Sequence, residues 1–195
     1  LIGYLGDQGK AYRNEIEGGT VAGTDNVGGI VGYNAGEIKH SSSSATISGS
    51  SDIGGLVGEN AGTLRLSVGT GNVSVTGSNA GGLIGNNTGT LKNSSSNGGT
   101  ISGGDIIGGV VGLNSGTITR THTGGTIIGA ATTRGGTVGT DNGGTYTENF
   151  WNITLNATLS DTGAGNIAEI TSETTANLQT QATYTASPPD WNFSL

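Results

Sequence analysis

Hydrophobic positions along the chain fall in short clusters of one or two residues, which Gly, Asn and Ser separate. After residue 81 the clusters are Leu83-Ile84, Leu91, Ile101 and Ile106-Ile107. No window shows the 3, 4, 7 spacing of an amphipathic helix. The pattern predicts three short strands and three turns in each stretch of 27 residues.

A seven-residue pattern recurs through the chain and reads GGLVGEN in the copy at residue 54. Its five copies begin at residues 28, 54, 81, 108 and 135, in steps of 26, 27, 27 and 27 residues. Such a period indicates stacked units that bury their apolar faces against one another. It predicts an all-β fold, a three-sided β-solenoid (β-helix) of about five coils, in which residues 1–27 are a partial coil.

When the copies are aligned, apolar residues fall into four columns. Stacked about 4.8 Å apart, such columns form a continuous interior. The columns are Ile30, Leu56, Leu83 and Val110; Val31, Val57, Ile84, Val111 and Val138; Ile38, Leu64, Leu91 and Ile118; and Val21, Ile47, Val75, Ile101 and Ile127. Small or hydroxyl residues flank the members of the last column, which indicates a half-buried strand.

Gly and Asn also recur at fixed places in the copies. The residues are Gly32, Asn34, Gly58, Asn60, Gly85, Asn87, Gly112 and Asn114. Gly suits a corner or a close approach to a neighbouring backbone. Asn tolerates left-handed turns, and stacked Asn side chains can bond to each other as a ladder. We therefore interpret these positions as structural turn residues rather than as ligands.

The composition changes near residue 146, because both Trp, both Phe and both Pro follow it. Residues 1–145 are predicted to form the repeat array and residues 146–195 an irregular aromatic C-terminal cap, since an open solenoid end exposes core and strand edge. The residues expected to plug this end, or else to stack on a sugar or mediate assembly, are Phe150, Trp151, Trp191 and Phe193. A short helix is expected within residues 171–182, with Ser172 or Thr174 as its N-cap.

Composition narrows the function classes. The 195 residues include 40 Gly and neither Cys nor Met, and the formal net charge is -7. Without Cys no disulfide or Cys-based metal site can form, and without Met the chain is expected to be processed or cut from a longer one. The acidic balance argues against nucleic acid as a partner. No apolar run approaches the roughly 18 residues of a membrane span, so membrane insertion is not expected.

The sequence predicts no catalytic residue, no metal site and no cofactor. His40 and His122 lie about three coils apart, roughly 15 Å across stacked strands, which is too far to share a metal. A column of acids could supply an acid pair or a calcium site, but repeated turn residues explain it more simply. This column contains Asp25, Asp52, Asn79 and Asp105.

Two rows of predicted surface residues suggest binding faces. Lys39, Arg65 and Lys92 form a basic row. This row could bind an anionic glycan, or it could simply keep an exposed sheet from associating with other sheets. A Thr/Ser face that could bind ice contains Thr20, Thr46, Ser74, Thr100 and Thr126.

The copies resemble the GLUG motif, named for its Gly-Leu-hydrophobic-Gly core, which reads GLVG at 55, GLIG at 82, GIVG at 29 and GVVG at 109. The stretch TTANLQTQATYTASPPDWNFS at 174 also looks like the segment that closes such arrays. The resemblance implies a bacterial extracellular or cell-surface protein, such as a large adhesin or a surface-protease accessory region, and no activity of the motif itself. The copy at 135 departs from the motif at Thr137 and Asp141, so we expect the array to end there.

These observations predict a non-enzymatic structural or adhesive rod of a bacterial extracellular or surface protein. An alternative is a self-assembling filament subunit whose C-terminal segment contacts a neighbouring subunit by strand exchange. A third is a glycan- or ice-binding module. The expected partners are therefore the chain itself, end to end, or a surface glycan or protein.

Overall fold

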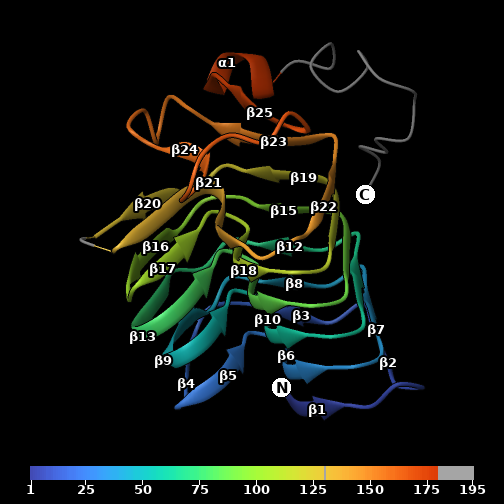
Figure 1. Cartoon of the computed structure of the whole chain (residues 1–195). Helices are drawn as coiled ribbons and strands as arrows, with labels where there is room; N and C mark the ends of the chain where they lie inside the picture. The colour runs from blue at the N-terminus through green and yellow to red at the C-terminus, as the bar shows by residue number, and fades with distance from the viewer. Residues whose placement is uncertain (130, 180–195) are drawn as a thin grey trace.

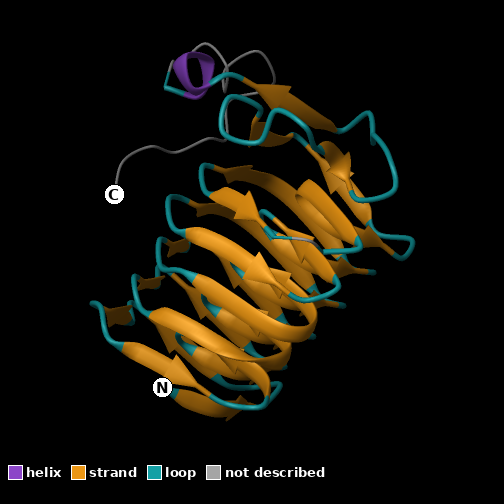
Figure 2. Cartoon of the chain, turned by 90° about the vertical axis from the view of Figure 1, so that its left-hand side faces the viewer, coloured by secondary structure: helices purple, strands orange, loops and turns teal. Residues whose placement is uncertain are grey.

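The computed structural model describes residues 1–129 and 131–179, and it confirms the predicted all-β solenoid (Figure 1). Parallel strands of successive turns pair along one axis, and the stack of turns is plain from the side (Figure 2). Each turn passes along three sides, which we call side one, side two and side three. In one turn these are residues 57–60, 63–69 and 73–81.

Side one is formed by the second half of each seven-residue copy. Its strands are β1 (Ile2–Leu5), β6 (Val31–Asn34), β10 (Val57–Asn60), β14 (Ile84–Asn87), β18 (Val111–Asn114) and the end of β21 (Thr133–Asp141). The strand β1 pairs in register with β6 of the first copy, because Ile2 pairs with Val31 and Tyr4 with Tyr33. Residues 1–27 are therefore a complete turn, and the solenoid has about six turns rather than five.

Side two follows a short corner and bends once. Its strands are β2 (Lys10–Tyr12), β3 (Glu15–Ile16), β7 (Glu37–Lys39), β8 (Ser42–Ser43), β11 (Thr63–Arg65), β12 (Val68–Gly69), β15 (Thr90–Ser96) and β19 (Thr117–Thr123). At the bend one residue of each turn has a positive φ, between 50° and 56°. These residues are Arg13, His40, Leu66, Asn93, Arg120 and Glu148.

Side three closes the turn. Its strands are β4 (Thr20–Ala22), β5 (Asp25–Gly28), β9 (Thr46–Gly54), β13 (Val73–Gly81), β16 (Thr100–Gly103), β17 (Ile106–Gly108), β20 (Thr126–Ile128) and the start of β21. It bends at Asn26, Asp52 and Asn79, whose φ angles are 51°, 55° and 62°. The left-handed non-glycine positions of side three are therefore these bend residues. The Asn of the seven-residue copies do not have positive φ angles.

Parallel pairing continues beyond residue 145. On side two, β22 (Thr145–Thr147) and β23 (Asn149–Asn152) pair with β19, and β25 (Ile170–Glu173) pairs with β23. The strand β24 (Ser160–Thr162) pairs with β21. The predicted helix is confirmed as α1 (Thr175–Leu178), which is capped by Thr174 and not by Ser172, because the Thr174 hydroxyl accepts from the Asn177 N–H.

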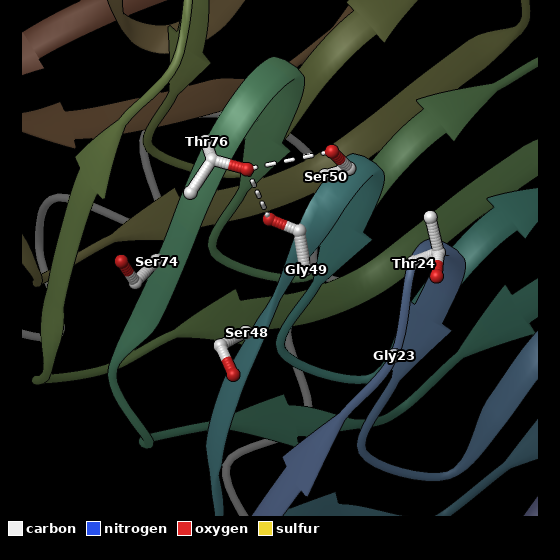
Figure 3. Close-up of a pocket in the computed structure, with 7 residues that line it drawn as sticks. All are labelled: Gly23, Thr24, Ser48, Gly49, Ser50, Ser74 and Thr76. Carbon is white, nitrogen blue, oxygen red and sulfur yellow. Dashed lines mark hydrogen bonds between the residues drawn. The ribbon is translucent and has the colours of Figure 1, made fainter.

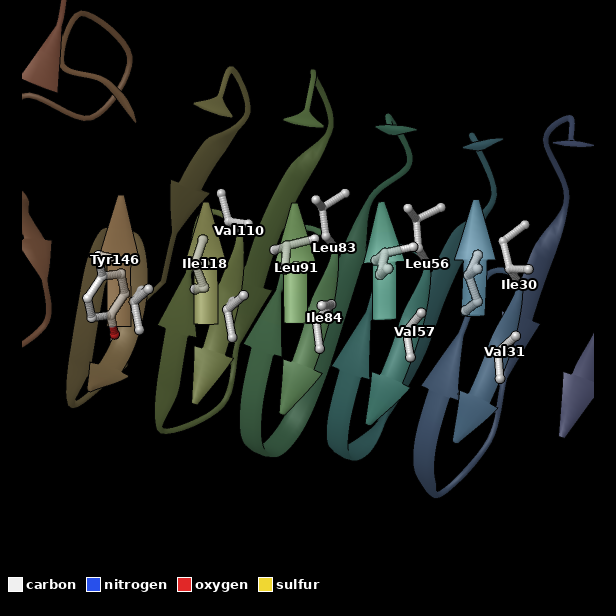
Figure 4. Packing of buried hydrophobic residues seen from close by; sticks show 14 of the residues in the cluster. Ile30, Val31, Leu56, Val57, Leu83, Ile84, Leu91, Val110, Ile118 and Tyr146 are labelled. Atoms are coloured by element: carbon white, nitrogen blue, oxygen red, sulfur yellow. The ribbon is translucent and has the colours of Figure 1, made fainter. Parts of the chain in front are cut away.

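The interior consists of two hydrophobic clusters that run along the axis. The larger lies between sides one and two, and its rows of Ile, Leu and Val follow one another from turn to turn (Figure 4). The smaller lines side three, where Val73 rather than the predicted Val75 pairs with Ile47 and Ile101. Burying one such aliphatic side chain contributes roughly 1.5–3 kcal/mol, so the repeated columns supply the main stabilisation of the stack.

Candidate functional site

The buried Asn of the copies form a hydrogen-bonded ladder along the axis. The Nδ2 of Asn34 donates to Oδ1 of Asn60 at 2.7 Å, Asn60 donates to Asn87 at 2.8 Å, and Asn87 donates to Asn114 at 2.7 Å. All four side chains are fully buried. An amide carries both a donor and an acceptor, so Asn60 and Asn87 can each bond to the Asn of the turn before and of the turn after. The ladder holds neighbouring turns in one register.

Tyr146 extends this ladder where the copies end. Asn114 Nδ2 donates to the Tyr146 hydroxyl at 3.0 Å, and that hydroxyl donates to Oδ1 of Asp141 at 2.7 Å. Burial, followed by the hydrogen bond and the charge of Asp141, raises the pKa of the Tyr146 phenol, although the bond from Asn114 opposes the shift. The phenol therefore stays protonated and can donate. Asp141 is exposed, so a carboxylate is tolerated at this end of the ladder.

The Gly of each copy is required by a close approach of two turns. A Cβ on Gly58 would lie 2.3 Å from the carbonyl carbon of Asn26, and one on Gly85 would lie 2.3 Å from that of Asp52. Asn26 and Asp52 are bend residues of side three, so the bend of one turn packs against side one of the next. Only a residue without a Cβ fits there.

A second buried polar ladder supports the bend of side two. The hydroxyls of Ser41, Ser67 and Ser94 each donate to the carbonyl two residues earlier, at 3.1, 2.9 and 2.9 Å. The N–H groups of Ser41 and Ser67 donate to the hydroxyl of the next turn at 3.1 and 3.2 Å. Sequence reasoning missed this ladder, although Ser recurs at the repeat spacing.

At the C-terminal end Trp151 lies inside the solenoid. Its side chain is 2 % exposed, and its indole N–H donates to Oδ1 of Asp161 at 2.7 Å. A Cβ on Gly136 would lie 2.3 Å from the indole ring. Phe150 is half-buried on the opposite face of its strand. The other aromatic residues named for this end, Trp191 and Phe193, lie outside the described residues.

The basic row lies on the outer surface of side two. Pairing places Lys39 opposite Tyr12 and Arg65, and Arg65 opposite Lys92. Arg65 is ion-paired, because its Nη2 lies 2.6 Å from Oε1 of Glu37, whose other carboxylate oxygen accepts from the Tyr12 hydroxyl. Lys39 and Lys92 flank this pair.

The hydroxyl face lies on side three and differs from the predicted column. Thr20 pairs with Thr46, and Thr100 with Thr126, but Asn72 rather than Ser74 lies between Thr46 and Thr100. Ser74 instead pairs with Ser48 and Ser102 in the neighbouring column. Ser48 and Ser74 of this column also line a shallow groove, whose residues are Gly23, Thr24, Ser48, Gly49, Ser50, Ser74 and Thr76 (Figure 3). This surface is neutral and rich in hydroxyl groups.

The predicted column of acids is wrong. Asp25 pairs with Ser51, so Asp52 shares its column with Asn26 and Asn79 and lies one position out of register with Asp25. Burial is the main cause of the raised pKa of Asp52, and the charge of Asp25 adds to it, while the Asn79 amide partly opposes the shift by donating at 2.7 Å. Among residues 1–129 and 131–179, no group of three His, Cys, Asp or Glu is arranged to hold a metal ion.

The two histidines lie on side two, far apart in the stack. His40 is a bend residue of the second turn, and His122 lies on β19 in the fifth. Burial lowers the pKa of His122 to about 4. The pKa of His40 is also lowered, first by desolvation and then by the charges of Lys39, Arg13 and Arg65.

Parallel strands stacked at a period near 27 residues define the chain as a β-solenoid repeat protein. Within that class, the family model for the GLUG motif matches residues 23–48, which confirms the resemblance seen in the copies. The matched segment covers the first full copy and the strands on either side of it. The searches of curated proteins and of solved structures found no match.

Proposed function

We propose that this solenoid is a non-enzymatic structural and adhesive rod of a bacterial extracellular or cell-surface protein. The observation that carries the proposal is the continuous Asn ladder from Asn34 to Asn114, with its Tyr146 extension. A ladder that runs from the second turn to Tyr146, together with apolar columns along the stack, resists bending between turns. A stiff unit of this kind suits a protein that holds two surfaces apart or presents a flat side to a partner.

The polar groups of the described surface favour contact over catalysis. Asp52, the acid whose pKa is raised, accepts a hydrogen bond from the Asn79 amide, and its nearest acid, Asp25, pairs with Ser51 one position away and not with Asp52 itself. Side two and side three instead offer rows of side chains in strand register. No helix in the described part of the chain is long and apolar enough to cross a membrane.

Adhesion is tested with beads coated with the purified chain. We expect the beads to be retained on bacterial cell-wall material or on immobilised polysaccharides, and beads coated with the destabilised Val111→Asp variant to wash off at a temperature above the melting point of that variant. The same samples are assayed for new reducing ends and unsaturated products. Failure to adhere to any surface, or catalytic release of sugar fragments, would overturn the proposal.

The structural role has its own test. Duplication of residues 81–107, one full repeat, should lengthen the rod by one strand spacing of about 4.8 Å. Small-angle scattering measures the cross-section and the length separately. A cross-section that changes, or a length that does not, would contradict a stack in which each turn contacts only its neighbours.

A further inference from the structure

Side two has an unusual share of the positive charge. In the first five turns it comprises residues 10–16, 37–43, 63–69, 90–96 and 117–123, which contain six Lys and Arg and two Glu. The rest of residues 1–129 contains six Asp and Glu and neither Lys nor Arg. Within the first five turns, side two therefore has a formal charge of +4 in a chain whose net charge is -7.

Four of the six cations on this side lie in two outward columns that follow the rod axis, while Arg13 and Arg120 lie at the bend. One outward column runs Tyr12, Lys39, Arg65, Lys92 and Thr119, each paired with the next. Adjacent members lie about 4.8 Å apart because they occupy neighbouring strands. The second outward column runs Lys10, Glu37, Thr63, Thr90 and Thr117. We call these ten residues the side-two strip.

The chemistry of the strip is mixed rather than purely cationic. Lys39 and Lys92 present ammonium groups, whereas the charge of Arg65 is offset by Glu37 at 2.6 Å. Hydroxyls of Thr63, Thr90 and Thr117 line the adjacent column. Tyr12 is 43 % exposed at one end and offers an aromatic face.

We infer that the side-two strip binds a linear acidic polysaccharide laid along the rod axis. Its carboxylates or sulfates would contact Lys39 and Lys92, its hydroxyls the Thr column, and a sugar ring would stack on Tyr12. This inference rests on the proposed adhesive function and specifies its partner. A polymer with spaced charges and many hydroxyls fits separated cations interleaved with Thr better than a dense polyphosphate does.

A second copy of the chain fits the strip less well. Association of two copies by charge would need a matching row of acids, and the acids of side three do not form one. Asp25 and Asp52 are offset by one position, and Asp52 is bonded to Asn79. A solenoid bound through the strip would therefore meet a polymer and not the side of another rod.

The inference is tested by titrating the chain with polygalacturonate, dextran sulfate and neutral dextran, using fluorescence anisotropy at several salt concentrations. We expect binding to an acidic polymer that weakens with salt, and no binding to dextran. The double variant Lys39→Gln, Lys92→Gln should bind about tenfold more weakly. Arg134→Gln removes one positive charge from side three and is the control, with a change of less than about twofold. Polygalacturonate and dextran sulfate distinguish carboxylate from sulfate recognition.

Several results would overturn the inference. These are no binding to either acidic polymer, equal losses in the Lys double variant and in Arg134→Gln, equally tight binding of single-stranded DNA, or a concentration-dependent dimer that the Lys double variant abolishes. The bead assay separates the two levels of the proposal. If beads of the Lys double variant still adhere fully, the side-two strip is not the binding site, but the proposed adhesive function stands. If wild-type beads never adhere, both the adhesive function and the inference about the strip are refuted.

Discussion

Asn87→Asp is the sharpest test of the Asn ladder. Asn87 is fully buried, accepts from Asn60 at 2.8 Å and donates to Asn114 Oδ1 at 2.7 Å. An ionised Asp at this position could still accept from Asn60, but its carboxylate would face the Asn114 oxygen with no proton between them. The carboxyl is therefore expected to stay protonated in the folded state, with its pKa raised well above the value in the unfolded chain.

The cost of this substitution depends on pH. An unfolded Asp has a pKa of about 3.9, and each pH unit above it costs about 1.4 kcal/mol to keep the folded carboxyl protonated, which gives roughly 4 kcal/mol at pH 7. A folded pKa that is raised means that the folded state binds more protons, so stability is close to that of the parent below about pH 4 and is lost as the pH rises. Such a loss is a large part of the stability of a typical domain.

The measurement is urea unfolding by circular dichroism at pH 4, 5, 6 and 7. The matched control is Asn86→Asp, the same change at the preceding residue, which lies half-buried beside Glu59 and Leu113. Its effect should stay below about 1 kcal/mol. If Asn87→Asp costs no more than the control at pH 7, or if its cost does not grow between pH 4 and pH 7, the ladder does not hold the turns as described.

Three further substitutions test other parts of the stack. Val111→Asp places an unpaired charge in a fully buried column and should cost several kcal/mol in thermal unfolding, whereas Thr117→Asp on the outer surface should do little; equal melting temperatures would contradict the register. Gly85→Ala should cost about 1–3 kcal/mol because its Cβ meets backbone, while Gly3→Ala, with nothing within 4 Å, should be nearly neutral. Asp52→Asn should stabilise the protein by less than about 1 kcal/mol at pH 7, because a raised pKa means that folding disfavours the charged carboxylate and Asn removes that charge. The gain should vanish towards pH 4, where the carboxyl becomes protonated; a gain that persists at pH 4 would assign the effect to packing.

The seven-residue copies made side one predictable. Within a copy no residue is inserted, so Val31, Val57 and Ile84 pair as counting along the sequence predicts. Gly58 also followed from the pattern, although its reason is the approach of Asn26 from the preceding turn. The strands that follow each copy directly were equally clear, since Ile38, Leu64 and Leu91 share one column.

Counting was less reliable on side three, at the far end of each repeat. The step from the first copy to the second is 26 residues instead of 27, and the pairing of β13 with β9 shifts between Val75 and Ser78. A slip of one residue moves a side chain to the other face of a strand. Such a slip grouped Asp25 with Asp52. Val75 and Ser74 were instead misplaced by two residues, which keeps a side chain on the same face but assigns it to the neighbouring column.

The sequence by itself determined the period, the all-β class, the apolar columns and the Gly and Asn of the copies, because each follows from residues repeated at fixed spacing. The sequence also aligned Lys39, Arg65 and Lys92. Only the tertiary structure decided which other outward side chains meet. It joined Glu37 to Arg65 across 28 residues, placed Ser67 under the bend of side two, and gathered six cations on one side. The physical reason is that neighbours on a solenoid surface are one turn apart, and the exact length of every corner between them sets their register.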